Sequence, residues 1–275
     1  MATSAIRSQT AAGGEAVVIT GTDNVRYYVS IYNGGTIRAT PASNGRVNLI
    51  VDGSNSGSLL EINRIVAGVR NNNGAHTFRS QGTAASRLNI ASITISSGFI
   101  GAIEGYQTAN LSGPIVVTNA TRVDRIAFSS ILPGGSISVA GDLNTLDVYR
   151  DVTLSGASIS IGRDLNWFQT YGNVTLTNGG NFLVGRDVGE TVQPAKGSGN
   201  AGQGIYIAGN LTINTGSNFA VARNIPIVTG VTGAGVVVLG NFNGLSRFFV
   251  AGGTEFNPPV NHNFANVTFA GTFSP

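Results

Sequence analysis

The chain has 275 residues, of which only 11% are charged, against roughly 25% in an average domain. Its formal net charge is +3 and it has no cysteine, which excludes disulfides, thiolate nucleophiles and Cys-ligated zinc. No run of basic residues is interleaved with aromatic residues, and no apolar run reaches the roughly 18 residues of a membrane helix, so we expect neither a nucleic-acid partner nor a membrane span.

The pattern of apolar and polar residues predicts three parts in chain order. Residues 1–16 are predicted to form a flexible N-terminal arm, and they lack the continuous apolar core of a secretory leader. Residues 17–44 hold most of the alternating stretches AVVITG and RYYVSIYNGGTI, which predict N-terminal strands. Residues 45–275 are predicted to form one repetitive domain, with loops near 70–86 and 189–204, where Gly and Asn or Pro cluster.

A short motif recurs through the second half of the chain. Its copies are VAGDL at Val139, IGRDL at Ile161, VGRDV at Val184, IAGNL at Ile207, VARNI at Val221 and VLGNF at Val238. The first three intervals are 22, 23 and 23 residues, and the last two are 14 and 17. A second series, out of phase with the first, has VYRDV at Val148 and TYGNV at Thr170, again 22 residues apart. Such self-similarity is typical of a solenoid, a propeller or an array.

The stretches between the motifs decide among these architectures. SISVAGDL, GIYIAGNL and GVVVLGNF alternate apolar with small or polar residues, which predicts short strands with one face inward, and no stretch has helical spacing. A propeller blade needs about 40 residues. The period of about 22 residues therefore predicts an all-β fold, a single-stranded parallel β-helix with very little helix, in which each strand pairs with its equivalent one coil later, about 4.8 Å along the axis.

Stacked coils would place equivalent side chains in columns. Two inward aliphatic columns are expected: Val139, Ile161, Val184 and Ile207, and Leu143, Leu165, Val188 and Leu211. The Asp or Asn of the motif would form a structural ladder at one corner, comprising Asp142, Asp164, Asp187, Asn210, Asn224 and Asn241. Glycine tolerates positive φ, and Asx side chains bond the turn backbone, so both residue types suit a corner.

The arginine before two of these aspartates has two interpretations. We expect Arg163 and Arg186 to be solvated or paired with an Asp of a neighbouring coil, each exposed pair contributing about 0–1 kcal/mol. Alternatively, they belong to a charged ligand face that comprises Arg163, Trp167, Tyr171 and Arg186. Aromatic platforms for sugars are available in the same region from Tyr149 and Phe168, although packing between coils is the favoured interpretation of all these aromatic residues.

The units GRDL, GRDV and AGNLT resemble those of bacterial secreted and cell-surface β-strand-repeat proteins. These are right-handed parallel β-helices of the adhesin, filamentous-haemagglutinin and autotransporter-passenger kind, and the repeat proteins of planctomycete-like bacteria. The resemblance extends from about Gly45 to the C-terminus, with a motif only from Val139 to Leu211. It implies an extracellular or cell-surface location and roles in adhesion, matrix or surface layers. The chain lacks the calcium-binding nonapeptide GGxGxD, and no cofactor is expected.

A search for catalytic groups finds little. The Gly-His-Gly and Arg-Ile-Lys tripeptides of polygalacturonase-like enzymes do not occur, and the two histidines, His76 and His262, have no neighbouring carboxylates, which argues against a metal site or a catalytic triad. Asp142 and Asp164, one coil apart, would lie about 5 Å from each other, as in retaining glycosidases, but any stacked pair gives this spacing. No catalytic or metal-binding residue is therefore predicted.

The sequence favours a non-enzymatic structural or adhesive β-solenoid. Its partners would be copies of itself, assembled end to end into an extracellular filament or surface layer through the strand edges that each end exposes. A cell-surface glycan is a second expected partner. The alternative is a carbohydrate-binding or carbohydrate-cleaving parallel β-helix that uses the Arg-Asp face near Trp167. A third hypothesis is that the chain is a fragment of a longer repeat protein.

Overall fold

The computed structural model describes residues 9–12, 16–21, 25–64, 86–189, 204–214 and 216–222, and beyond them the strand segments 235–238, 242–244, 248–250, 254–256, 267–269 and 273–274. The predicted loops near 70–86 and 189–204 lie outside the described residues except at their ends, as do Asn224 and Asn241. Within the described part, the only helix is a 3-10 turn at Ser43–Gly45, and no helix is long and apolar enough to cross a bilayer.

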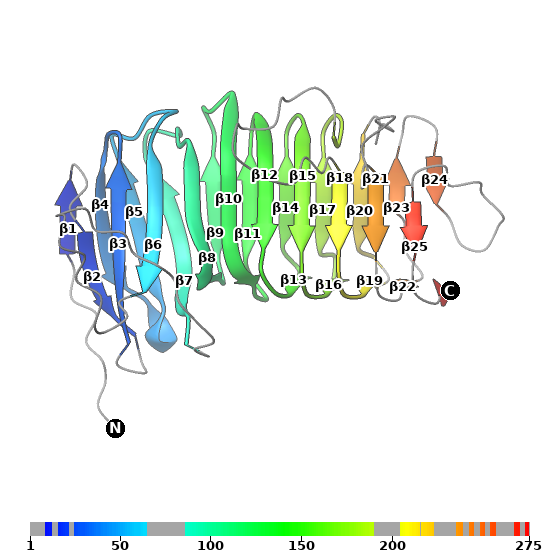
Figure 1. Ribbon diagram of the computed structural model, residues 1–275, viewed down its shortest axis with the longest axis horizontal. Helices are drawn as coiled ribbons and strands as arrows, with labels where there is room; N and C mark the ends of the chain where they lie inside the picture. Colours follow the sequence, from blue (N-terminus) through cyan, green and yellow to red (C-terminus); the bar gives the residue numbers. More distant parts are fainter. Residues whose placement is uncertain are drawn as a thin grey trace, which may run out of the picture.

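The chain forms a parallel β-solenoid, as the repeat predicted, and Figure 1 shows its strands side by side from the N-terminal to the C-terminal end. Each coil has three faces. Face A contains β6 (Leu59–Arg64), β8 (Ala102–Leu111), β10 (Arg122–Ile131), β12 (Asp142–Val148), β15 (Leu165–Thr170), β18 (Gly204–Ile207), β21 (Gly235–Val238) and β25 (Val267–Phe269).

The other two faces follow in each coil. Face B contains the start of β7 (Leu88–Ile95), the ends of β8 and β10, and β13 (Val152–Ser155), β16 (Val174–Thr177), β19 (Leu211–Ile213), β22 (Phe242–Gly244) and β26 (Phe273–Ser274). Face C contains β5 (Val47–Asp52), the end of β7, and β9 (Pro114–Val117), β11 (Ser136–Val139), β14 (Ser158–Ile161), β17 (Asn181–Val184), β20 (Asn218–Val221) and β23 (Phe248–Val250).

The N-terminal strands are antiparallel, which the repeat did not indicate. On face C, β1 (Gln9–Ala12) pairs with β4 (Thr36–Pro41), and β4 pairs with β5. On face A, β2 (Ala16–Thr20) pairs with β3 (Arg26–Tyr32), and β3 pairs with β6. Strand β1 lies in the segment for which a flexible arm was predicted. The parallel pairing begins where β5 pairs with β7 and β6 pairs with β8. Near the other end of the solenoid, β24 (Thr254–Phe256) pairs antiparallel with β23.

Alternation of inward and outward side chains builds the core. In β14 and β16 every second residue is fully buried, and the same pattern recurs in most of the parallel strands, so one face of each strand lines the interior. Identical positions stack from coil to coil: Ile137, Ile159, Phe182 and Phe219 pair in register on face C. The rings of Phe182 and Phe219 stack with centroids 4.4 Å apart.

The expected inward columns are correct up to Val188 and wrong beyond it. Val139, Ile161 and Val184 pair in register, and Leu143, Leu165 and Val188 do so one corner later. Ile207, however, pairs with Thr170, and Leu211 pairs with Val174, so both belong to the second motif series. The residue that continues the column of Val184 is Val221. This coil is longer than the preceding ones, since partners lie 37 residues apart, as in Asn181 and Asn218.

Candidate functional site

The corner between faces C and A carries a ladder of aspartates. The backbone N–H of Asp164 donates to Oδ1 of Asp142 (3.1 Å), and the N–H of Asp187 donates to Oδ1 of Asp164 (3.2 Å). Asp164 and Asp187 are 5% and 0% exposed. The carboxylates of Asp142 and Asp164 thus each accept a hydrogen bond from the backbone of the next coil, which satisfies an N–H group that the turn would otherwise leave without a partner.

The arginines of the motif pair with the aspartates of the preceding coil. Nε of Arg163 lies 3.4 Å from Oδ1 of Asp142, and Nη2 of Arg186 lies 2.9 Å from Oδ2 of Asp164. The carboxylates of Asp142 and Asp164 therefore bind backbone and guanidinium groups of the scaffold. The corner glycine has a steric role rather than the expected positive φ: a Cβ at Gly162 would lie 2.3 Å from the carbonyl oxygen of Ala140.

Asn210 does not belong to this ladder, which corrects its assignment from the sequence. It belongs to a second ladder at the corner between faces A and B, where the N–H of Asn173 donates to Oδ1 of Asp151 (2.8 Å) and the N–H of Asn210 donates to Oδ1 of Asn173 (2.9 Å). The IAGNL motif fits both series, and the lengthened coil shifts it from one corner to the next. Asn224 and Asn241, the last predicted members, lie outside the described residues.

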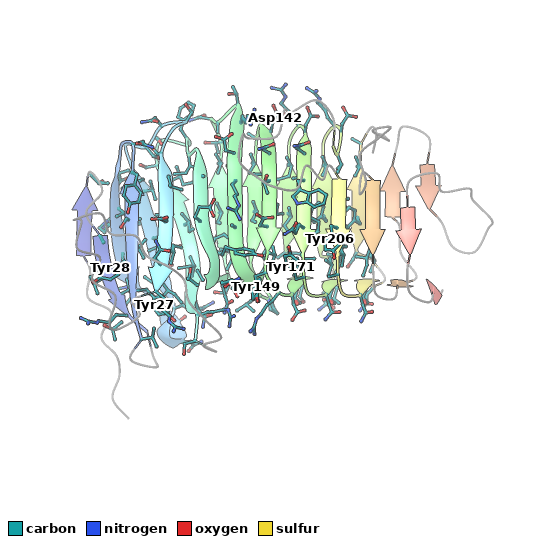
Figure 2. All side chains as sticks on the ribbon, in the orientation of Figure 1. Tyr27, Tyr28, Asp142, Tyr149, Tyr171 and Tyr206 are labelled. Atoms are coloured by element: carbon teal, nitrogen blue, oxygen red, sulfur yellow. The ribbon has the colours of Figure 1, made fainter. Side chains whose placement is uncertain are left out.

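The four residues of the predicted ligand face occupy two places. Arg163 and Arg186 lie at the corner with the aspartates, whereas Trp167 and Tyr171 lie on the outer surface of face A. There they belong to what we call the aromatic strip, which comprises Tyr106, Tyr149, Trp167, Tyr171 and Tyr206. Figure 2 shows Tyr149, Tyr171 and Tyr206 following one another along the solenoid. Phe168 is not a platform, since it is fully buried in the core.

The rings of the aromatic strip form one chain of contacts. Ring centroids are 5.3 Å apart for Tyr106 and Tyr149, 6.2 Å for Tyr149 and Tyr171, 6.2 Å for Tyr171 and Tyr206, and 6.5 Å for Tyr206 and Trp167. Gln169 links two of them, because its Oε1 accepts from Nε1 of Trp167 (3.1 Å) and its Nε2 donates to the hydroxyl of Tyr171 (2.9 Å). The Tyr171 side chain is 51% exposed.

The tyrosines and the single tryptophan, all of them described, lie mostly on the outside of face A. The half-buried Tyr28 and Tyr32 of β3 also alternate with buried residues there, so that of the 7 tyrosines only Tyr27 points into the core. Face B presents small hydroxyls instead, in register at Thr153, Thr175 and Thr212. The outer surface of face A therefore differs in chemistry from that of face B.

A charged cluster adjoins the strip at Tyr106. Arg125 bridges two carboxylates, with Nη1 3.1 Å from Oε1 of Glu104 and Nη2 2.6 Å from Oδ2 of Asp147, and its guanidinium lies 5.7 Å from the ring centroid of Tyr106. Burial raises the pKa of both carboxyls, although Arg125 opposes the shift. Burial also opposes the charge of Arg125, but the two carboxylates outweigh it and raise the pKa of the guanidinium.

Sequence reasoning missed Glu104, Arg125, Asp147, Tyr106 and Tyr206. The signal that could have found the charged cluster is the repeat itself, since its partners are 21 and 22 residues apart in the chain. Glu104 and Arg125 precede the first copy of the motif at Val139, so no repeated sequence indicated which residues of these coils are in register. Among the described residues, no group of three or more His, Asp or Glu side chains could hold a metal ion.

No protein-family model matches the chain, and no curated protein or solved structure matches it either. The proposed function therefore rests on the solenoid and on the geometry of its side chains.

Proposed function

We propose that this chain is a non-enzymatic adhesive β-solenoid that binds a polysaccharide along the aromatic strip. The observation that carries the proposal is the continuous chain of ring contacts from Tyr106 to Trp167, whose members come from the coils of β8, β12, β15 and β18. Aromatic rings offer apolar area with a polar handle, which suits the apolar faces and hydroxyl edges of sugars. Gln169 adds an amide between two of the rings, within reach of a ligand that lies over them.

Two features of the side chains argue against catalysis. The aspartates at the corner are occupied by backbone N–H groups and arginines of the scaffold. Burial raises the pKa of Tyr106 to about 12, with smaller contributions from Tyr171 and Asp147, so its hydroxyl is a poor base at neutral pH. A general base or acid works best with a pKa near the working pH.

Binding to immobilised or insoluble polysaccharides tests the proposal. Trp167→Ala and Tyr171→Ala should each weaken binding by about tenfold, which is typical of an aromatic residue at the centre of an interface. Leu183→Ala is the matched control, since Leu183 is 36% exposed and lies on face C. Equal binding by all three variants would contradict the proposal. Release of reducing sugar by the wild-type protein would support the carbohydrate-cleaving alternative instead.

We propose in addition that copies of the chain assemble end to end outside the cell, as a filament or a surface layer. In the described part of the chain, β1 and β2 at one end and β25 and β26 at the other each pair with a single strand. A strand with one unpaired edge is a template for another chain. Electron microscopy of concentrated protein should show filaments that lengthen along the solenoid axis, and a field of monomers at high concentration would contradict this proposal.

A further inference from the structure

Tyrosine and tryptophan are the side chains of this protein that a one-electron oxidant meets. The sequence contains no cysteine and a single methionine, at position 1, against 7 tyrosines and 1 tryptophan. All the tyrosines are described, and Tyr171 alone among them is exposed, while the other six are half-buried or buried. An oxidant in solution therefore reaches the phenol of Tyr171 before any other.

Tyr171 has a second phenol beside it in the preceding coil. Val148 and Thr170 are partners in the register of β12 and β15, so the residues that follow them, Tyr149 and Tyr171, occupy equivalent positions one coil apart. Their ring centroids are 6.2 Å apart and the ring planes are inclined by 57°, which is the geometry of two rings in contact. Because adjacent strands are only about 4.8 Å apart, a rotation of the exposed Tyr171 side chain brings a carbon of each ring together.

The other two tyrosines of the aromatic strip are less suited to react with each other or with these two. Tyr106 lies 5.3 Å from Tyr149, but burial raises the pKa of Tyr106 to about 12, with smaller contributions from Tyr171 and Asp147, so its hydroxyl gives up a proton less readily. Tyr206 is opposite Gln169 in the register and therefore diagonal to Tyr171, and its ring is stacked on Trp167. Tyr149 is thus the favoured partner of Tyr171.

We propose that Tyr149 and Tyr171 are an oxidative modification site, at which a dityrosine bond joins the coil of β12 to the coil of β15. The oxidant is hydrogen peroxide, used by a haem peroxidase. Each phenol loses one electron and one proton, and the two tyrosyl radicals form a carbon–carbon bond between the ring positions next to their hydroxyls. The hydrogens on the bonded carbons then move through solvent to the two oxygens, which restores both phenols. The two electrons and two protons reduce one molecule of peroxide to two of water.

The bond would give the solenoid a covalent link between coils. The sequence has no cysteine, so no disulfide can join one coil to the next. A bond between Tyr149 and Tyr171 closes a loop of 22 residues and restricts the unfolded chain in the same way as a disulfide does. The inference goes beyond the proposed function, since it depends on no ligand.

Oxidation of the full chain in dilute solution, with a haem peroxidase and hydrogen peroxide, tests the inference. Trypsin cleaves after Arg and Lys, so the four tyrosines of the strip fall on four different peptides, which are 88–122, 126–150, 164–186 and 197–223. Mass spectrometry should find peptide 126–150 joined to peptide 164–186, at the sum of their masses less two hydrogens. Gel electrophoresis should show that the linked protein is still a monomer.

Three variants isolate the pair. Tyr149→Phe and Tyr171→Phe should each lose the fluorescence of dityrosine, because phenylalanine keeps the ring and lacks the phenol that is oxidised. Tyr32→Phe is the matched control, since Tyr32 is half-buried on face A but outside the aromatic strip, and it should form the link as the wild type does. Oxidation should raise the melting temperature of the wild type by about 5–10 °C and leave that of Tyr171→Phe unchanged.

Several results would overturn the inference. They are a link between any other pair of these peptides, dityrosine found only between chains, and fluorescence in Tyr171→Phe equal to that of the wild type. An equal yield of the 126–150 to 164–186 link in concentrated urea would also overturn it, because the pairing would then not depend on the fold. None of these results concerns the binding of polysaccharides by the untreated protein, so the inference and the proposed function can fail separately.

Discussion

Replacing Asp164 tests whether the aspartate ladder is structural. Its Oδ1 accepts the N–H of Asp187 (3.2 Å), its Oδ2 pairs with Arg186 (2.9 Å), and the side chain lies in a corner where Asp187 is fully buried. Asp164→Ala removes the acceptor and leaves the N–H of Asp187 without its partner. Asp164→Asn keeps an oxygen at the same place and removes only the charge.

The expected magnitudes follow from these contacts. A buried donor left without a partner costs about 1–3 kcal/mol. The pair with Arg186, whose side chain is 35% exposed, adds at most about 1 kcal/mol. The free energy of unfolding should therefore fall by about 2–3 kcal/mol in Asp164→Ala. In Asp164→Asn it should fall by about 1 kcal/mol or less, because the amide keeps the acceptor oxygen and only the charge that faces the partly exposed Arg186 is lost.

Urea denaturation followed by fluorescence measures both variants. Trp167 is the only tryptophan of the chain and lies in β15, which starts directly after Asp164, so its emission reports on the coil that is perturbed. Losses that agree within about 0.5 kcal/mol for the two variants would show that the Oδ1 contact to the next coil contributes nothing, and the structural interpretation of the ladder would fail.

Three further predictions address the core and the charged groups. Phe182→Ala removes a buried ring whose centroid lies 4.9 Å from that of Phe168 and 4.4 Å from that of Phe219, and it should lower the free energy of unfolding by about 3–5 kcal/mol. Leu183→Ala, on the outer side of the same strand, should lower it by less than about 1 kcal/mol. Equal losses in the two variants would contradict the alternation of inward and outward side chains. An absorbance titration of the wild type should show one tyrosine that ionises at about pH 12, and this ionisation should be missing in Tyr106→Phe. If Tyr106→Phe keeps the ionisation at that pH, another tyrosine is responsible for it. Burial raises the pKa values of Glu104 and Asp147, so the folded protein binds protons at these carboxyls more tightly than the unfolded chain does, and their contribution to stability is present in acid and is lost as the pH rises through the raised pKa values. The melting temperature of the double variant Glu104→Gln, Asp147→Asn should therefore lack this fall with rising pH. A double variant whose melting temperature depends on pH as that of the wild type does would contradict the prediction.

The architecture of the coils could be predicted from the sequence alone. Alternation of apolar and polar residues is a local property of each strand, and a period of about 22 residues is short enough to hold one coil and too short for a propeller blade. The sequence also predicted which residues stack between Val139 and Val188, because the spacing there is nearly constant and equivalent positions are one period apart.

Which residues share an outer surface could not be predicted from the sequence, because it depends on how the coils stack. The register is set by hydrogen bonds between coils, and the lengthened coil before Gly204 moved Ile207, Asn210 and Leu211 to the next corner although their motif is unchanged. The aromatic strip was hidden from sequence reasoning for the same reason. Its members come from different coils, and the distance along the sequence does not tell which side chains stack once coils differ in length. The antiparallel N-terminal strands were equally invisible, since alternation is the same for strands that run in either direction.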